Sequence, residues 1–288
     1  MHLKSIKNNK NLMAKKSKKN INEMTFLDHL EELRWLLVRS SAAILTGGAI
    51  AWFFNDFIFK TIIFGPMKGD FITYQFFCDL ANKYDLDKSF CDTTLNFSIQ
   101  NTEIEGQISL LVWTCITAGF IISFPYILLQ FWNFISPALY KKEKKNAVKF
   151  IVISSLLFFL GVLFGYFVLT PLSLNFLSTF TVSDVIKNDI NVNSYIGTVK
   201  TTTLATGLIF ELPIIIYFLS TLGLVTPSFL REYRKWAYVI ILIIAAIVTP
   251  PDVISQVIVT IPLIILYEIS IFISAFIFKK NNKSITTI

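Results

Sequence analysis

The chain has 288 residues, of which 54% are hydrophobic and only 16% carry a charge, and its mean hydropathy is +0.61. This composition excludes an ordinary water-soluble globular domain and indicates an integral membrane protein. The net charge of +7 comes mainly from lysine. In so apolar a chain we expect that charge to set the orientation in the membrane and not to bind nucleic acid.

The N-terminus is polar and basic, and an apolar run follows it. We expect residues 1–22 to form a disordered cytoplasmic tail. The apolar run at 36–54 is longer than the core of a secretory signal, and no small-residue cleavage site follows it. It is therefore predicted to be an uncleaved first span at about 35–55.

Further apolar stretches follow the first span. They predict spans at about 108–132, 149–171, 196–220, 236–250 and 253–278, outer loops at 56–107 and 172–195, and a cytoplasmic tail at 279–288. Residues 23–278 would then form a single membrane domain. Pro171 is expected to close the third span because proline cannot continue a regular helix.

The fifth stretch is short for a membrane span. Only the 14 residues from Trp236 to Thr249 precede the pair Pro250-Pro251. As a helix they would measure about 21 Å, against about 30 Å for the hydrocarbon core. Residues 236–278 form either a re-entrant pair or two spans. We favour two spans in a locally thinned bilayer. The fifth span is expected to be short, and the sixth span can be short as well.

The distribution of charge supports this assignment. Most of the 26 lysine and arginine residues fall in segments placed in the cytoplasm, and the others are assigned to the outer loops, where most acids also lie. All five tryptophans lie near predicted span ends, as an interfacial belt requires. The sequence predicts an all-α polytopic membrane protein with six transmembrane helices and both termini in the cytoplasm.

A helix is predicted just before the first span. Thr25 can cap it, and apolar residues recur after it at helical spacing: Phe26, Leu30, Leu33 and Leu37. We expect this face to lie on the membrane or against other helices. Asp28 and Glu32, four residues apart, share the other side with Glu31.

The loop between the second and third spans carries a second polar motif. Ser136-Pro137 predicts a helix start, which would lead through Leu139 and Tyr140 into lysines at 141–145. One acid, Glu143, stands among those lysines. The loop is either simply solvated, its lysines fixing its side of the membrane, or Glu143 receives a cation.

Five motifs in order resemble those of the TatC family, the Sec-independent twin-arginine protein translocase. They are H-L-E-E-L-R at 29–34, F-I-S-P-A-L-Y-K-K-E at 134–143, F-E-L-P at 210–213, T-P-P-D-V-I-S-Q at 249–256 and Y-E-I at 267–269. The similarity covers roughly residues 24–278. The first motif departs from the family, which often has another arginine where this chain has Leu36, so any role for a basic pair there is in doubt.

The resemblance implies a concave bundle that acts as a receptor and not as an enzyme. It would bind signal peptides with two consecutive arginines and, with single-span TatA/TatB-type partners in a larger complex, export folded proteins using the proton gradient. It implies the bacterial cytoplasmic (inner) membrane, with no cofactor and no metal.

The resemblance also assigns residues to the signal-peptide site. Glu32 and Glu143 are the expected acids, and Asp28 or Glu31 would assist them. The same two motifs supply further candidates: Arg34, Phe134, Pro137, Leu139 and Tyr140. For Glu32 the alternative is an ion pair with a basic residue of its own helix, such as Arg39.

Polar residues within or beside the later spans are further candidates. Glu211 follows Thr203 and Gly207 at steps of four, and it either lines a functional inner face or bonds a neighbouring helix as a protonated carboxyl. By resemblance, Gln256 and Thr260, near Asp252, form a patch where a partner helix docks. For Glu268 the sequence does not decide between a packing role and a functional one.

The first outer loop is expected to be structural. By resemblance, Pro66 and the stretch after it form a cap over the span ends. Cys78 and Cys91 would face an oxidising compartment, but the sequence alone does not decide whether they form a disulfide. Cys115 lies within a span and is expected to be a small apolar residue.

Other classes of protein fit less well. An intramembrane hydrolase lacks a histidine within the spans, because both histidines precede the first one, and no nucleotide-binding G-x-x-x-x-G-K-[ST] motif occurs. A proton-coupled secondary transporter of small solutes is the alternative, since polar stripes and proline-interrupted helices are typical of transporters. Repeated halves, also common in transporters, are not evident.

Overall fold

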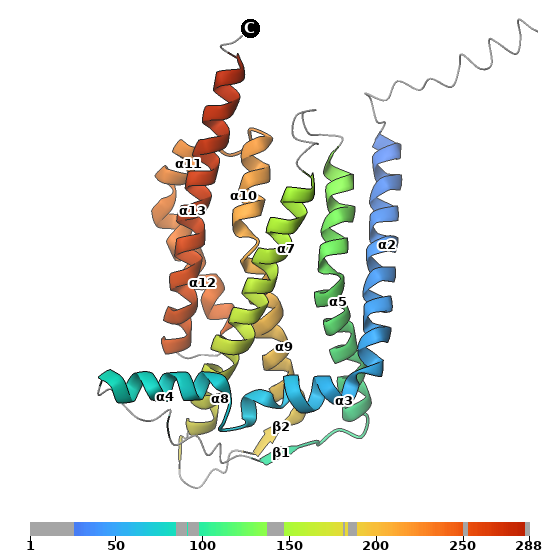
Figure 1. Cartoon of the computed structure of the whole chain (residues 1–288), viewed down its shortest axis with the longest axis vertical. Coiled ribbons are helices and arrows are strands. Elements are labelled where there is room, and N and C mark those ends of the chain that lie inside the picture. Colours follow the sequence, from blue (N-terminus) through green and yellow to red (C-terminus); the bar gives the residue numbers. More distant parts are fainter. Residues whose placement is uncertain are drawn as a thin grey trace, which may run out of the picture.

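The computed structural model describes residues 26–84, 91, 98–136, 147–180, 182–183, 189–249 and 253–285. These residues form a bundle of helices, in which α2 begins and α13 ends at the same end (Figure 1). We call this the inner end, because the charge pattern predicts that it faces the cytoplasm, and the opposite end the outer end. The helical bundle confirms the predicted fold class.

The crossing segments are α2 (Phe26–Phe53), α5 (Gly106–Ile135), α7 (Ala147–Phe164) with η4 (Gly165–Leu169) and α8 (Thr170–Thr179), α9 (Val192–Ile209) with α10 (Leu212–Thr221), α12 (Arg234–Val248) and α13 (Val253–Ile285). Short elements join them: α3 (Asn55–Phe57), η1 (Ile58–Ile63), η2 (Gly65–Met67), α4 (Ile72–Tyr84), β1 (Ser98–Gln100), β2 (Asp189–Asn191) and α11 (Pro227–Glu232). Counted over the described residues, the chain crosses six times, as predicted.

Helix lengths separate the fifth span from the others. Five segments are long and apolar enough to cross a bilayer: His29–Phe53, Gly106–Ile135, Val148–Ser178, Val192–Thr221 and Ser255–Lys279. The fifth crossing, α12, has 15 residues, about 22 Å of helix. The sixth has 25 residues, about 37 Å, so only the fifth span is short.

The third span does not end at Pro171, contrary to the sequence-based expectation. The chain makes a π-helical turn at η4 and continues through α8 to Thr179. Pro171 has no N–H to donate to the carbonyl of Phe167, one helical turn before it. The hydroxyl of Thr73 in α4 donates to that carbonyl instead. The carbonyl that the proline leaves unpaired is therefore the acceptor through which α4 binds to the third span.

The segment from α3 to α4 lies across the outer end of the bundle, as a cap (Figure 1). The buried Tyr74 hydroxyl lies 3.1 Å from the carbonyl of Pro66 and 3.2 Å from that of Pro171. Tyr195 of α9 donates to the carbonyl of Ile63 at 2.6 Å. Burial raises the pKa of Tyr74, which keeps its hydroxyl protonated as a donor. These bonds tie the buried Pro66 region to the third and fourth spans.

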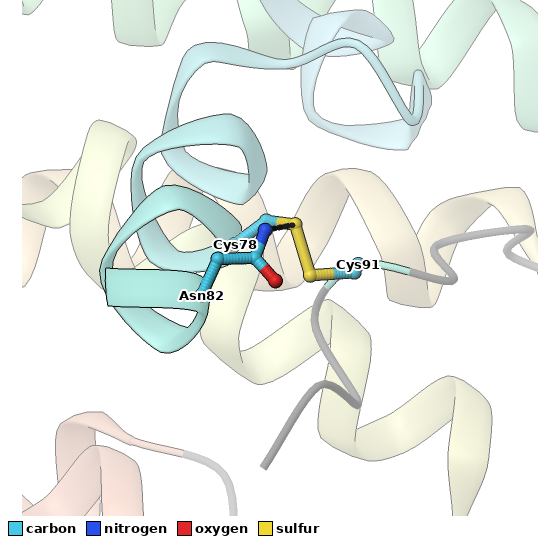
Figure 2. The surroundings of a disulfide bond; sticks show 3 residues. All are labelled: Cys78, Asn82 and Cys91. Atoms are coloured by element: carbon cyan, nitrogen blue, oxygen red, sulfur yellow. Dashed lines mark hydrogen bonds between the residues drawn. A yellow bond between two sulfur atoms is a disulfide. The ribbon is translucent and has the colours of Figure 1, made fainter. Parts of the chain in front are cut away.

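A small sheet and a disulfide also link the outer segments. The three-residue strands β1 and β2 pair in parallel, with Ile99 opposite Ile190, and so join the two outer loops. Cys78, in the middle of α4, forms a disulfide with Cys91, 13 positions later (Figure 2). Cys115 is free and buried.

The disulfide should stabilise the outer loop locally. Closing a loop of this size contributes about 2–4 kcal/mol, while the tyrosine bonds hold the rest of the cap. We expect Cys78→Ser to insert normally but to be cut in the outer loop about tenfold faster or more by an added protease. Reductant should produce the same change in the unaltered protein and none in the variant. Equal cleavage rates in all samples would contradict a stabilising role.

Candidate functional site

Helices α2 and α5 lie side by side (Figure 1) and bring the first two sequence motifs together. At the inner end, the rings of His29 and Phe134 stack with their centroids 4.3 Å apart. His29 lies three residues before Glu32, and Phe134 is the penultimate residue of α5. The acidic motif of α2 therefore stands beside the point where the chain leaves α5 toward residue 143.

Small residues allow the two helix backbones to approach closely. A Cβ on Gly119 of α5 would lie 2.4 Å from the backbone nitrogen of Gly48 and 2.4 Å from the carbonyl oxygen of Ile44. Nearer the inner end, the Ser123 hydroxyl donates to the carbonyl of Ala43 at 2.8 Å. This packing fixes how the motif on α2 sits against α5.

Glu32 is half-buried, and one of its two carboxylate oxygens is unpaired. Its Oε2 atom is buried and has no hydrogen-bond partner, and no ion pair joins it to another described residue. Arg39, considered above as a partner, instead lies over the ring of Trp35, 5.7 Å from the centroid. A carboxylate left in this state can accept a cation from another molecule.

The other predicted residues of this site are described only in part. Glu31 and Arg34 are exposed on α2, and Phe134 is half-buried. The backbone of Asp28 belongs to α2, but its side chain lies outside the described part. Four candidates of the connecting loop, and one beside the fifth span, also lie outside the described residues: Pro137, Leu139, Tyr140, Glu143 and Asp252.

Glu211 lies where the fourth span breaks between α9 and α10. Pro213 has no N–H to donate to the carbonyl of Ile209, and the helix tightens there. Glu211 is 7% exposed, and its carboxyl accepts a hydrogen bond from the Ser154 hydroxyl of α7. Its other oxygen is buried without a partner. The acid thus bonds a neighbouring helix, one of the two alternatives raised by the sequence.

Gln256 and Thr260 are partly used within the α12–α13 pair. The Gln256 amide donates to the carbonyl of Leu242 at 3.3 Å, and the Thr260 hydroxyl donates to the carbonyl of Gln256 at 2.7 Å. Gln256 is half-buried and Thr260 is buried. A docking partner would therefore contact polar side chains that are already hydrogen-bonded to the backbones of α12 and α13.

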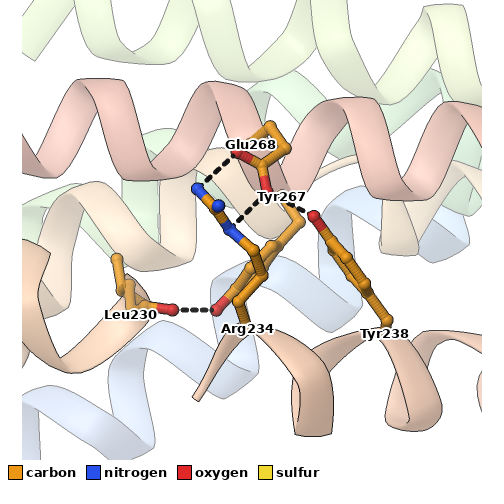
Figure 3. Close-up of polar contacts among 5 residues, drawn as sticks. All are labelled: Leu230, Arg234, Tyr238, Tyr267 and Glu268. Atoms are coloured by element: carbon orange, nitrogen blue, oxygen red, sulfur yellow. Dashed lines mark hydrogen bonds and ion pairs between the residues drawn. The ribbon is translucent and has the colours of Figure 1, made fainter. Parts of the chain in front are cut away.

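Glu268, whose role the sequence left open, takes part in a polar cluster between α12 and α13 (Figure 3). Arg234 contacts both of its oxygens, with Nε 2.9 Å from Oε1 and Nη2 3.0 Å from Oε2, and the Tyr238 hydroxyl donates to Oε1. Nearby, the Tyr267 hydroxyl donates to the carbonyl of Leu230 at 2.8 Å. The cluster joins the short fifth span to the sixth, so Glu268 has a packing role here. Arg234 is 34 positions away from its partner, and no local pattern signals the pair.

One charged residue was assigned wrongly from the sequence. Lys200 was counted among the outer lysines, yet it lies in α9, eight residues after Val192, within the fourth span. A helix rises about 1.5 Å per residue, so it starts about 12 Å from the outer end of α9. Its side chain leans toward that end and can bring the ammonium close to the headgroups. The predicted fourth span, at about 196–220, already contained this position, so the span was right and only the count of outer lysines was wrong.

The fold defines a polytopic α-helical membrane protein, and comparisons with known proteins define its family. The family model "Sec-independent protein translocase protein (TatC)" matches residues 28–262. The TatC of Blattabacterium is 44% identical over 261 residues, covering 90% of this chain and 98% of that protein, and the TatC of Aquifex aeolicus is 36% identical with the same coverage. A crystal structure of the twin-arginine translocase receptor TatC superposes with a TM-score of 0.67 at 36% identity, covering 85% of this chain and 99% of that one.

The chain belongs to the TatC family. It is therefore a subunit of the Sec-independent, twin-arginine protein translocase and a multi-pass protein of the inner membrane. This confirms the family predicted from the five motifs.

Proposed function

We propose that the chain is the core receptor of the translocase and binds signal peptides with two consecutive arginines at its inner end. Glu32 and Glu143 would be the principal acids, with Asp28 and Glu31 assisting. The observation that supports this is the buried, unpaired Oε2 of Glu32, beside the His29–Phe134 contact. The receptor would act without catalysis and without a cofactor.

The chemistry of carboxylates explains a preference for arginine. A guanidinium is a planar fork whose N–H groups can bond two carboxylate oxygens at once, whereas a lysine ammonium is a point charge. A charge-assisted bond of this kind contributes about 1.5–3 kcal/mol, against about 0–1 kcal/mol for a fully wet ion pair. The half-buried position of Glu32 favours the larger value.

Export itself would require partners. We propose that single-span TatA/TatB-type subunits dock on the outer part of α13 at Gln256 and Thr260, near Asp252, and that folded precursors then cross at the expense of the proton-motive force. Interhelical hydrogen bonds in membranes average only about 0.6 kcal/mol, which suits a reversible contact. Glu211 would lie on the concave face that such an assembly encloses.

A secondary transporter of small solutes remains the alternative to test. Membership of a translocase family favours the receptor. Co-purification of an Arg-Arg precursor with the protein would support the receptor, whereas saturable solute uptake by the purified chain alone would support the transporter.

Glu143→Lys tests the receptor directly. We expect the variant to insert normally but to lose binding of an Arg-Arg precursor, because a lysine there repels the guanidinium groups. The measurement is site-specific photocrosslinking from position 139 of the variant and of the unaltered protein, to precursors with Arg-Arg or Lys-Lys. Unchanged crosslinking of the Arg-Arg precursor to the variant would contradict the role.

A further inference from the structure

A cavity of about 470 Å³ opens at the outer end of the bundle, far from the inner acids. Its walls come from the segment after α2, from the start of α5 and from the start of α9. A volume of this size suits one small molecule or one chain of a lipid. A protein partner would instead need a contact of several hundred Å² on each side.

The polar lining residues all lie at the rim of the cavity, whereas apolar residues line both the rim and the space below it. Gln107 and Val192 stand at the first turns of α5 and α9, whereas Leu111 and Ile196 line the cavity one turn further into the membrane. Asn55 and Asp56 follow the end of α2 at the level of the rim. The rim is therefore polar at headgroup height, and the walls below it are apolar at the height of acyl chains.

An acid and a base form an ion pair at the rim. Asp56 pairs with Lys60 at 3.0 Å, and the two side chains remain 83% and 74% exposed. That pair uses only Oδ2 of the carboxylate. The exposed Gln107 amide makes no hydrogen bond with another described residue, whereas the amide of Asn101 is held by the backbone of Glu103 at 2.9 and 3.4 Å. The ion pair thus leaves Oδ1 of Asp56 as an acceptor at the rim, with the Lys60 ammonium beside it.

We propose that this cavity binds an outer-leaflet phospholipid whose headgroup carries a primary ammonium, of the phosphatidylethanolamine class. The ammonium donates to Asp56, the phosphate pairs with Lys60, and one acyl chain lies along Leu111 and Ile196. A choline headgroup has no N–H to donate to the carboxylate. An anionic headgroup without an ammonium meets the carboxylate charge unfavourably.

Native mass spectrometry of the purified full-length protein tests the site. The protein is exchanged into detergent with equal amounts of phosphatidylethanolamine, phosphatidylcholine and phosphatidylglycerol, and the retained lipid is counted. We expect one retained ethanolamine lipid, and about a tenfold loss of it in Asp56→Asn, where a charge-assisted bond is removed. Asp70 is another exposed acid of the cap and lies outside the cavity, so Asp70→Asn is the matched control and should retain the lipid.

A second variant tests the apolar wall. Leu111→Trp should fill the space and abolish retention while the protein keeps its melting temperature. Equal retention of choline and ethanolamine lipids, or retention unaffected by both Asp56→Asn and Leu111→Trp, would overturn the proposal. So would a photocrosslinker at position 107 that, in native membranes, captures a protein and no lipid.

Discussion

Replacing Glu32 by lysine is expected to lower crosslinking of an Arg-Arg precursor by at least about tenfold, with normal amounts of protein in the membrane. The reason is the loss of a partly desolvated charge-assisted bond, about 1.5–3 kcal/mol, to which the new cation adds repulsion. Each 1.4 kcal/mol changes a binding constant about tenfold. The carboxylate has no partner of its own in the described structure, so its removal should not destabilise the helix.

A charge-matched control separates this effect from a general change of surface charge. Glu232 is an exposed acid of α11 near the inner end, and Glu232→Lys should leave precursor crosslinking within about twofold. Glu31→Lys, next to Glu32 but at an exposed position, should give an intermediate loss. Because Glu32→Gln keeps the shape and removes only the charge, it should retain part of the binding to Arg-Arg and lose the discrimination against Lys-Lys. Full crosslinking to Glu32→Lys would refute the assignment of this acid.

Hydropathy was enough to predict the crossings but not their ends. Helices do not stop at the edge of the hydrocarbon, because their backbone bonds continue wherever no residue breaks them. The first span was predicted from about residue 35, with a capped helix just before it, and the structure joins the two in one helix, α2, which begins at Phe26. Its amphipathic start, at Glu31 and Glu32, runs unbroken into the apolar part.

The error at Pro171 has the same physical origin. A proline ends a helix only if the carbonyl it leaves unpaired has no other donor. Here Thr73 supplies that donor from α4, a segment almost a hundred positions earlier. No local pattern in the sequence could have indicated this bond, or the pairing of β1 with β2 across the two outer loops.

For the candidate site, too, some features could be predicted from the sequence and others only from the fold. The family resemblance named Glu32 and Phe134 as candidates, which stay predictions, and only the fold places their two helices side by side. Glu268 shows the limit of such reasoning: its partner Arg234 comes from the preceding span. An acid within a span was therefore recognised as unusual before its role could be assigned.

Gly119→Ala is expected to destabilise the protein by about 1–3 kcal/mol or more. The added Cβ would stand 2.4 Å from two backbone atoms of α2, and neither can move without shifting the helix. The helices would have to separate, which loses the close packing that small residues permit. In detergent we expect the apparent melting temperature to fall by roughly 3–10 °C.

Gly197 of α9 provides the matched control, because a Cβ there would meet no atom within 4 Å. Alanine is favoured over glycine in a helix by about 1 kcal/mol, so Gly197→Ala should be neutral or slightly stabilising. The same glycine-to-alanine substitution is thus expected to lower the melting temperature at position 119 and to leave it unchanged or raise it slightly at position 197. Separation of α2 from α5 would also part His29 from Phe134, and precursor crosslinking should fall together with stability in Gly119→Ala. If both variants melted at the same temperature, close contact of the α2 and α5 backbones could not be what holds the acidic motif in place.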